Sequence, residues 1–212
     1  MKTKLIQLAL TLVGITLPQW SNAVTIINFD TFPGGAPVPD NTVITTQYLP
    51  VGVTFSSGVS GGAPSAGVFA GEASSGPNML VGSFAGAVGL YNIIMDFTPA
   101  ASPNSVTFDL ISIGTGIVTV NAFASDHLTL LDTVSVTHGL LAGNGFGNVD
   151  KRTLTGLGIS RVVFDITQTT AVIDGYGIDN VVFSVPEPTS FALASAGMLA
   201  FLFSRPARKT TV

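Results

Sequence analysis

The 212-residue chain contains no cysteine. It therefore forms no disulfide, offers no thiolate to a metal and has no cysteine nucleophile. Small secreted domains often depend on disulfides, but a chain of this size can bury enough apolar surface without them. The missing cysteine excludes cysteine chemistry and leaves export open.

Charge is also scarce, and basic charge is nearly missing from the middle of the chain. Charged residues make up 9% of the sequence, and only Lys151, Arg152 and Arg161 are basic outside the two ends. Between Val24 and Val185 these three stand against 11 acidic residues, a balance of −8. Nucleic-acid affinity depends mainly on Lys and Arg side chains, so this balance excludes nucleic acid as a partner.

Residues 1–23 predict a secretory signal peptide. Lys2 and Lys4 precede an apolar run over residues 5–17, and Ser21 and Ala23 place small residues at the −3 and −1 positions of a cleavage site. The run is shorter than the ~20 residues that a membrane-spanning helix needs. We expect signal peptidase to cut after Ala23.

Residues 185–212 form a segment with three parts. Pro186, Glu187 and Pro188 are followed by an apolar stretch over residues 191–203 and then by the basic residues Arg205, Arg208 and Lys209. This order resembles the carboxy-terminal sorting signal of PEP-CTERM proteins. The chain departs from that signal in a thinner basic cluster and in the extra residues 210–212.

The resemblance implies that a membrane-embedded exosortase processes the chain at the Pro-Glu-Pro box. The two prolines keep the box extended, which suits a strand-like substrate. The apolar stretch is expected to form a short helix in the membrane, and the cationic residues after it to stay cytoplasmic as a membrane stop. The alternative is an uncut single-pass anchor, for which the stretch is short. The predicted route is export through the inner membrane, transient anchoring, and a final place at the cell surface or outside the cell.

Residues 24–184 have the pattern of one all-β domain. The 24 Gly and 12 Pro residues, with recurring Thr, Val, Ser and Ile, favour short strands joined by tight turns. We expect strands over residues 24–30, 42–48, 52–56, 67–70, 78–81, 88–97, 105–112, 117–125, 128–136, 161–167 and 177–184. Val106, Phe108 and Leu110 share one strand face, and such faces need a second sheet to cover them. The prediction is a two-sheet antiparallel jelly-roll-like sandwich.

Parts of this domain resemble the first and last strands of bacterial extracellular β-sandwich domains related to carbohydrate-binding modules. The similar stretches are residues 28–32 with 52–55, and residues 175–183. The resemblance implies a binding-type domain and nothing about the identity of a ligand. If the domain is a sugar-binding module, extracellular polysaccharide is the candidate partner. Tyr48, Tyr91 and Tyr176 are the tyrosines that could stack on sugar rings, and core packing explains each of them equally well.

The sequence shows no convincing catalytic motif. Residues 58–62 spell the G-x-S-x-G pattern around Ser60, but a hydrolase elbow needs a helix after its serine, and residues 63–67 predict a loop. His127 and His138 are expected in surface turns without metal-ligand spacing. We therefore expect a non-catalytic surface or matrix protein of the exopolysaccharide or biofilm layer, as the sorting-signal family implies. The alternative is a secreted hydrolase whose site forms only in the folded chain.

Calcium is the one cofactor that the sequence leaves open. Asp179 shares a strand face with Val181 and Phe183, so its charge needs a partner if that face is buried. First and last strands often lie side by side in such sandwiches, which would bring Asp30 to Asp179 as calcium ligands. The alternative is that both aspartates cap turns or face solvent at strand ends.

Overall fold

Short strands make up most of the chain that the structure describes. The computed structural model describes residues 23–58, 62–69, 71–84, 87–88, 91–111, 116–138, 149–168 and 176–185. Its strands are β1 (Ala23–Ile27), β2 (Thr42–Val43), β3 (Val53–Ser57), β4 (Ala63–Val68), β5 (Asn78–Phe84), β6 (Ala87–Val88), β7 (Ile93–Phe97), β8 (Ser105–Ile111), β9 (Gly116–Phe123), β10 (Leu130–His138), β11 (Val149–Thr155), β12 (Arg161–Gln168) and β13 (Gly177–Val185). A single turn of 3-10 helix, η1 (Leu49–Val51), is the only helical element in these ranges.

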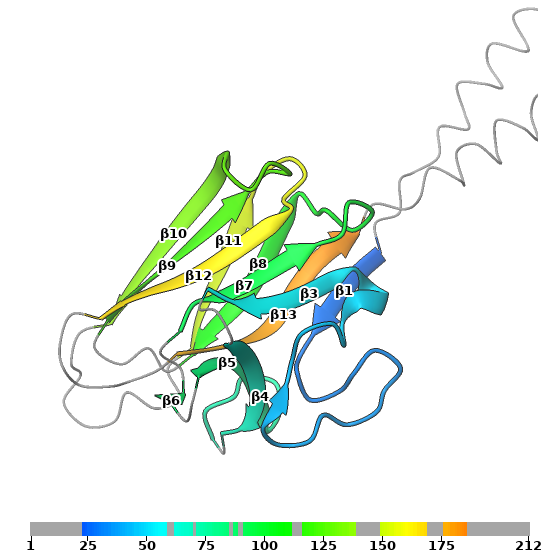
Figure 1. The fold of residues 1–212 in the computed structure, drawn as a ribbon, viewed down its shortest axis with the longest axis vertical. Helices are drawn as coiled ribbons and strands as arrows, with labels where there is room; N and C mark the ends of the chain where they lie inside the picture. The colour runs from blue at the N-terminus through cyan, green and yellow to red at the C-terminus, as the bar shows by residue number, and fades with distance from the viewer. Residues whose placement is uncertain are drawn as a thin grey trace, which may run out of the picture. The chain divides into compact units, whose positions relative to one another are not determined.

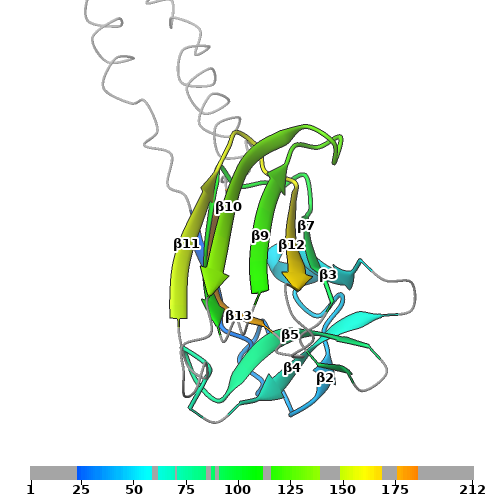
Figure 2. The ribbon, with the colours of Figure 1, turned by 90° about the vertical axis from the view of Figure 1, so that its left-hand side faces the viewer.

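The strands form two antiparallel sheets, which confirms the predicted sandwich (Figure 1). One sheet has the order β11-β8-β13-β5-β4-β2, with β1 also paired to β13 and β6 to β5. The other has the order β10-β9-β12-β7-β3. Figure 2 shows the sheets as two layers, with β10 beside β11 at one edge. The expected signal peptide and apolar C-terminal helix lie outside the described residues.

The core lies between the two layers, where alternate side chains of each strand meet. Val106, Phe108 and Leu110 of β8 are fully buried, as their alternation predicts. Phe108 packs edge-on against Phe164 of β12, with ring centroids 4.9 Å apart. Phe97 of β7 meets Phe183 of β13 in the same way at 5.0 Å. These aromatic pairs join the sheets face to face.

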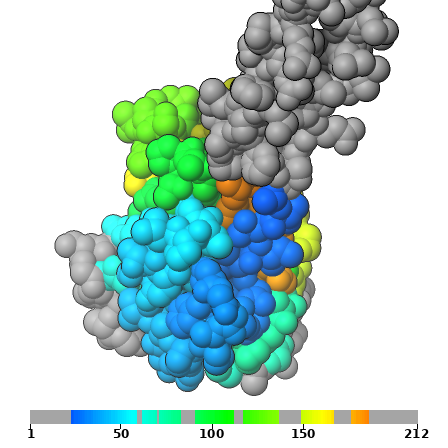
Figure 3. Space-filling view, turned by 90° about the vertical axis from the view of Figure 1, so that its right-hand side faces the viewer, coloured from blue at the N-terminus to red at the C-terminus, as the bar shows by residue number. Residues whose placement is uncertain are grey.

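The first and last strands of the sandwich lie side by side. β1 and β13 are antiparallel, and their register runs from Ala23 opposite Val185 to Ile27 opposite Val181. In Figure 3 the blue N-terminal strand lies against the orange last strand. Residues 23–185 hold together as one unit. The strand after the predicted signal peptide therefore closes the sheet by pairing with the strand before the predicted sorting segment.

Among the local expectations that were wrong, three concern residues 42–48, residues 63–67 and strand β11. The strand expected over residues 42–48 ends at Val43, because Gln47 folds back to accept a hydrogen bond from Thr45 N (2.6 Å) and to donate one to Val43 O (2.7 Å). The loop expected over residues 63–67 is strand β4, which pairs with β5. Strand β11 was missed because its sequence is charged and only Leu154 is buried, a pattern typical of an edge strand.

Candidate functional site

A polar cluster lies where β13 changes its partner within the sheet. On one side, β13 pairs with β5 at Gly177 and Ile178 and with β1 from Val181 onward. Asp179 and Asn180 lie between these pairings, and the register with β8 shifts at the same point. Asn180 has a φ of +47°, a left-handed conformation that Asn tolerates better than most residues. The gap in the ladder is filled by the loop that contains Ser74 and Ser75.

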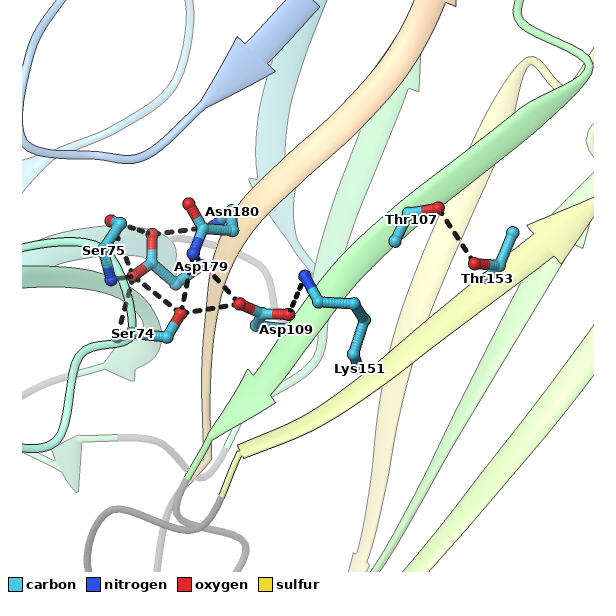
Figure 4. Close-up of polar contacts among 8 residues, drawn as sticks. All are labelled: Ser74, Ser75, Thr107, Asp109, Lys151, Thr153, Asp179 and Asn180. Atoms are coloured by element: carbon cyan, nitrogen blue, oxygen red, sulfur yellow. Dashed lines mark hydrogen bonds and ion pairs between the residues drawn. The ribbon is translucent and has the colours of Figure 1, made fainter.

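Asp179 is completely buried and is held by donors from that loop (Figure 4). Its Oδ2 accepts hydrogen bonds from the backbone N–H groups of Ser74 (3.0 Å) and Ser75 (2.8 Å). Its Oδ1 lies 2.9 Å from Ser75 Oγ and accepts from Asn180 N at 2.7 Å. Burial raises the pKa of the Asp179 carboxyl, and these hydrogen bonds oppose that rise only in part.

Asp109 of β8 lies opposite Asp179 in the same sheet. Lys151 Nζ is 2.7 Å from its Oδ1, while Ser74 Oγ (2.8 Å) and Asn180 Nδ2 (3.0 Å) donate to its Oδ2. Burial disfavours the charged form, but the bonds from Lys151, Asn180 and Ser74 outweigh it and lower the pKa of Asp109. Asp109 lies on the outward face that its strand pattern predicts, yet it is only 3% exposed, because these side chains cover it.

Asp30 joins the cluster from the segment after β1. Its Oδ1 accepts a hydrogen bond from Asn78 N (3.0 Å), and Ser75 Oγ lies 3.2 Å from its Oδ2. Since Ser75 Oγ also contacts Asp179, the two aspartates predicted as a pair meet at one hydroxyl group. Asn78 is buried; its amide nitrogen donates to the carbonyls of Phe29 and Val38, and its Oδ1 has no hydrogen-bond partner.

The cluster is rich in hydrogen-bond donors to carboxylates and contains no histidine. Within the described ranges, no three His, Cys, Asp or Glu side chains gather as a group that could hold a metal ion. The hydroxyls of Ser74 and Ser75 donate to Asp109 and Asp179, so neither is arranged as a nucleophile beside a base. The arrangement neutralises buried negative charge, and calcium stays a prediction for its oxygen atoms.

The residues that follow the possible hydrolase motif form a strand. Ser60 lies outside the described residues, but β4 begins at Ala63, so the pattern is followed by a strand and not by the helix that a nucleophile elbow needs. His127 lies in the β9–β10 turn, as predicted, with a φ of +57°. His138 was expected in a loop and is instead the last residue of β10.

Two of the three tyrosines belong to the core. Tyr48 is 2% exposed and donates to Thr31 O at 3.0 Å. Tyr176 is 1% exposed; its hydroxyl accepts from Ile93 N at 3.1 Å and lies 3.0 Å from Phe164 O. Tyr91 is half-buried. No aromatic side chain whose exposure the structure describes is exposed, so stacking on a sugar ring has little support from these residues.

Most residues of the predicted signal peptide and of the predicted sorting segment lie outside the residues that the structure describes. Ala23 is the first residue of β1. The box Pro186, Glu187 and Pro188 and the basic residues Arg205, Arg208 and Lys209 fall outside the described residues. Across the ranges that the structure covers, no helix has the length and apolar character needed to cross a membrane.

The sequence alone gave no signal for Ser74, Ser75, Asn180 or Lys151. The Ser74-Ser75-Gly76-Pro77 run reads as an ordinary turn, and nothing local shows that it fills a gap beside β13. Only the two aspartates carried a signal. The charge of Asp179 would need a partner if its strand face were buried, and first and last strands that lie side by side would bring Asp30 to it.

Comparison with known proteins finds a sorting signal and similar sandwiches. A carbohydrate-binding module of family 29 covers 77% of this chain and 89% of its own at 14% identity, with a TM-score of 0.41. The K1 cleaved adhesin domain of Lys-gingipain from Porphyromonas gingivalis W83 covers 77% of this chain and 98% of its own at 16% identity, with a TM-score of 0.47. The K2 domain of Lys-gingipain covers 76% and 99% at 13% identity, with a TM-score of 0.48. No curated protein matches the chain. Residues 184–209 match the PEP-CTERM protein-sorting motif, so this chain carries that sorting signal, which begins at Ser184, within the last two residues of β13.

Proposed function

We propose that this protein is an exported exosortase substrate whose mature form is a non-catalytic β-sandwich at the cell surface or in the extracellular matrix. The match to the sorting motif over residues 184–209 carries the proposal. The motif begins at Ser184, one residue before β13 ends, so the signal follows a complete folded unit without a separate linker. Signal peptidase and an exosortase are the processing partners that this arrangement requires.

Mass spectrometry of the protein purified from its own cell envelope tests the proposal. The expected mature form lacks the signal peptide and the residues after Pro188. A variant with Pro186→Ala and Pro188→Ala should keep its tail, because the box is then free to become helical. If the unaltered protein keeps the residues after Pro188, the proposed cleavage by an exosortase is wrong.

The non-catalytic role has support in how the polar groups are used. The buried carboxylates of Asp109 and Asp179 are engaged by Ser74, Ser75, Asn180 and Lys151. A serine hydrolase would need a base that takes the proton of its nucleophilic serine, usually a histidine, and the two serines of the cluster donate to buried carboxylates instead. A secreted hydrolase stays the alternative function, and a broad screen for hydrolase activity on residues 23–185 tests it.

Extracellular polysaccharide is the partner we propose for the sandwich. With no exposed aromatic among the described side chains, recognition would depend on polar groups. The outer face of β9 and β10 carries such a set: Thr133 Oγ1 donates to Asn121 Oδ1 at 2.8 Å, and Thr119 and Ser135 share a hydrogen bond of 3.2 Å. A glycan array probed with residues 23–185 tests this partner, with Asn121→Ala as the variant that should weaken binding. Absence of any glycan signal would favour a purely structural role in the matrix.

A further inference from the structure

Exposed apolar side chains gather at one end of the sandwich, the end at which β13 stops at Val185; we call it the tail end. Strand registers identify this end, since Thr155 of β11 pairs with Ser105, and Val106 of β8 pairs with Phe183 of β13. Figure 1 shows the β9–β10 turn, the β11–β12 connection and the end of β13 together at the upper end of the sandwich. Of the nine large hydrophobic side chains described as exposed, five lie in or beside the connections and strand ends of the tail end: Val24, Leu49, Leu128, Leu130 and Leu157.

Leu128 is 83% exposed at the tip of the β9–β10 turn, and hydrogen bonds to Asp126 hold that turn together. Asp126 accepts hydrogen bonds from Leu128 N (3.0 Å), Thr129 N (2.8 Å) and Thr129 Oγ1 (2.6 Å). His127 supplies the left-handed residue of the turn with a φ of +57°. These hydrogen bonds fix the backbone of the turn, and the Leu128 side chain stays in solvent.

Leu157 is 85% exposed on the neighbouring β11–β12 connection, which is also fixed on both sides. Gly156 N donates to Asn104 O at 3.0 Å, and Gly158 N donates to Asn104 Oδ1 at 3.0 Å. Ile159 N donates to Pro103 O at 2.8 Å. The loop is anchored to the β7–β8 connection, and its leucine is the part left in solvent.

The four connections of the tail end carry little charge. They are residues 46–52, 98–104, 124–129 and 156–160, and the only Asp, Glu, Lys or Arg among them is Asp126. The strand ends beside them add Asp132, which accepts a hydrogen bond from Thr155 N (2.8 Å), and the ion pair of Arg161 with Asp96 (2.6 Å). The carboxylate of Asp126 is occupied by its own turn, and the hydrogen bonds from Thr129 lower its pKa to about 2. An apolar surface with so little charge meets a low desolvation cost when it enters a lipid headgroup region.

We propose that the tail end docks on the lipid bilayer while the sorting segment is inserted, with Leu128 and Leu157 entering the interface. The apolar stretch begins at Phe191, the sixth residue after Val185. Six residues span at most about 20 Å, which is shorter than a nine-residue strand of ~30 Å. The tether therefore keeps the tail end, and not the opposite end, next to the membrane. Such docking would hold Pro186, Glu187 and Pro188 at the surface where a membrane-embedded enzyme acts, and in this respect the inference rests on the proposed function.

Single tryptophan probes test the docking. Trp20 is the only tryptophan of the chain, so residues 23–212 contain none. Leu128→Trp and Leu157→Trp are each placed in this chain and reconstituted in phosphatidylcholine and phosphatidylglycerol vesicles. Val68→Trp is the matched control, because Val68 is 48% exposed at the end of β4, away from the tail end. Lipids brominated near the top of the acyl chain should quench the first two probes and leave the Val68→Trp emission unchanged.

The possible outcomes separate the docking from the sorting proposal. Flotation of the protein with the vesicles reports insertion of the tail, independently of the probes. Protein that floats without quenching of either leucine probe overturns the docking and leaves the sorting role intact. Quenching of all three probes means that the sandwich contacts the bilayer with a side and not with the tail end, and this result also overturns the docking. A blue shift of the leucine probes that grows with protein concentration in vesicle-free solution would assign the surface to a second copy of the chain. Protein that does not float contradicts membrane insertion by the tail, on which both proposals depend.

Discussion

Asp179 and Asp109 lie opposite each other in the β8–β13 ladder, and the hydroxyl of Ser74 contacts both carboxylates, at 3.2 and 2.8 Å. Their environments shift the two pKa values in opposite directions. Burial raises the pKa of Asp179, while hydrogen bonds from Lys151, Asn180 and Ser74 lower that of Asp109. The cluster therefore ties the stability of the sandwich to pH.

Replacing Asp179 with Asn should change this pH dependence. A raised pKa in the folded protein contributes stability below the unfolded value of ~3.9, and that stability is lost as the pH rises through the folded pKa. Asp109, with its lowered pKa, contributes stability above the unfolded value that is lost as the pH falls. As the pH rises from about 4 to 7, Asp179→Asn should gain more stability than the unaltered protein. As the pH falls below about 4, Asp109→Asn should lose less stability than the unaltered protein. Urea unfolding from about pH 2 to 7 measures both, with Asp165→Asn as the control; three parallel curves would contradict the assignment.

Calcium should stabilise the sandwich if Asp30 and Asp179 act as its ligands. Both carboxylates contact Ser75 Oγ, at 3.2 and 2.9 Å, and the buried Oδ1 of Asn78 is a further oxygen without a partner. We expect EDTA to lower the melting temperature of residues 23–185 and added calcium to restore it, because a ligand that binds only the folded state stabilises it. Asp30→Asn should remove this response. A melting temperature that changes with neither EDTA nor calcium would contradict the calcium site.

Tyr176→Phe should destabilise the core without affecting ligand binding. The change removes the acceptor of Ile93 N, so a buried N–H loses its partner, at a cost of about 1–3 kcal/mol. Tyr48→Phe is the comparison, since Tyr48 loses only its bond to the carbonyl of the exposed residue Thr31. Chemical denaturation should show the larger loss for Tyr176→Phe. The reverse order would contradict this account of the two tyrosines.

Gly82→Ala should be more damaging than Gly177→Ala. A Cβ at Gly82 would lie 2.1 Å from the backbone oxygen of Tyr91, which cannot move without shifting the chain. A Cβ at Gly177 would meet the Met79 side chain, with Sδ at 2.4 Å, and a methionine can change its rotamer. We expect losses in the free energy of unfolding of about 3 and about 1 kcal/mol. Equal losses in thermal or urea unfolding would show that the close approach at Gly82 is not limiting.

Part of the fold could be predicted because some strands show a regular alternation of apolar and polar residues. Alternation in β8 identifies Val106, Phe108 and Leu110 as core residues, and the same pattern identifies Val162 and Phe164 in β12. Strand β11 could not be found in this way, because Asp150, Lys151 and Arg152 hide its period. Residues 63–67 were misread as a loop because small residues and Pro64 lower strand propensity, and pairing with β5 overrides it.

The candidate site was predictable only in its acidic members. The pairing of β1 with β13 brings Asp30 and Asp179 together, as expected for first and last strands. Ser74 and Ser75, more than 100 positions before Asp179, gave no local signal, because their role depends on a gap between β5 and β1. The alternation of β8 places Asp109 on the outward strand face, but its burial depends on Lys151 of another strand.

The sequence by itself determined the sorting signal of this protein and the class of its fold. A sorting signal is read as a linear segment, so the residues over 184–209 suffice to recognise it, and strand alternation suffices to predict two packed sheets. Tertiary structure decided how buried charge is neutralised and which apolar side chains are left in solvent. Both depend on contacts between segments far apart in the chain, which no local pattern encodes. The exposed Leu128 and Leu157, for example, are placed at the same end of the sandwich only by the strand registers.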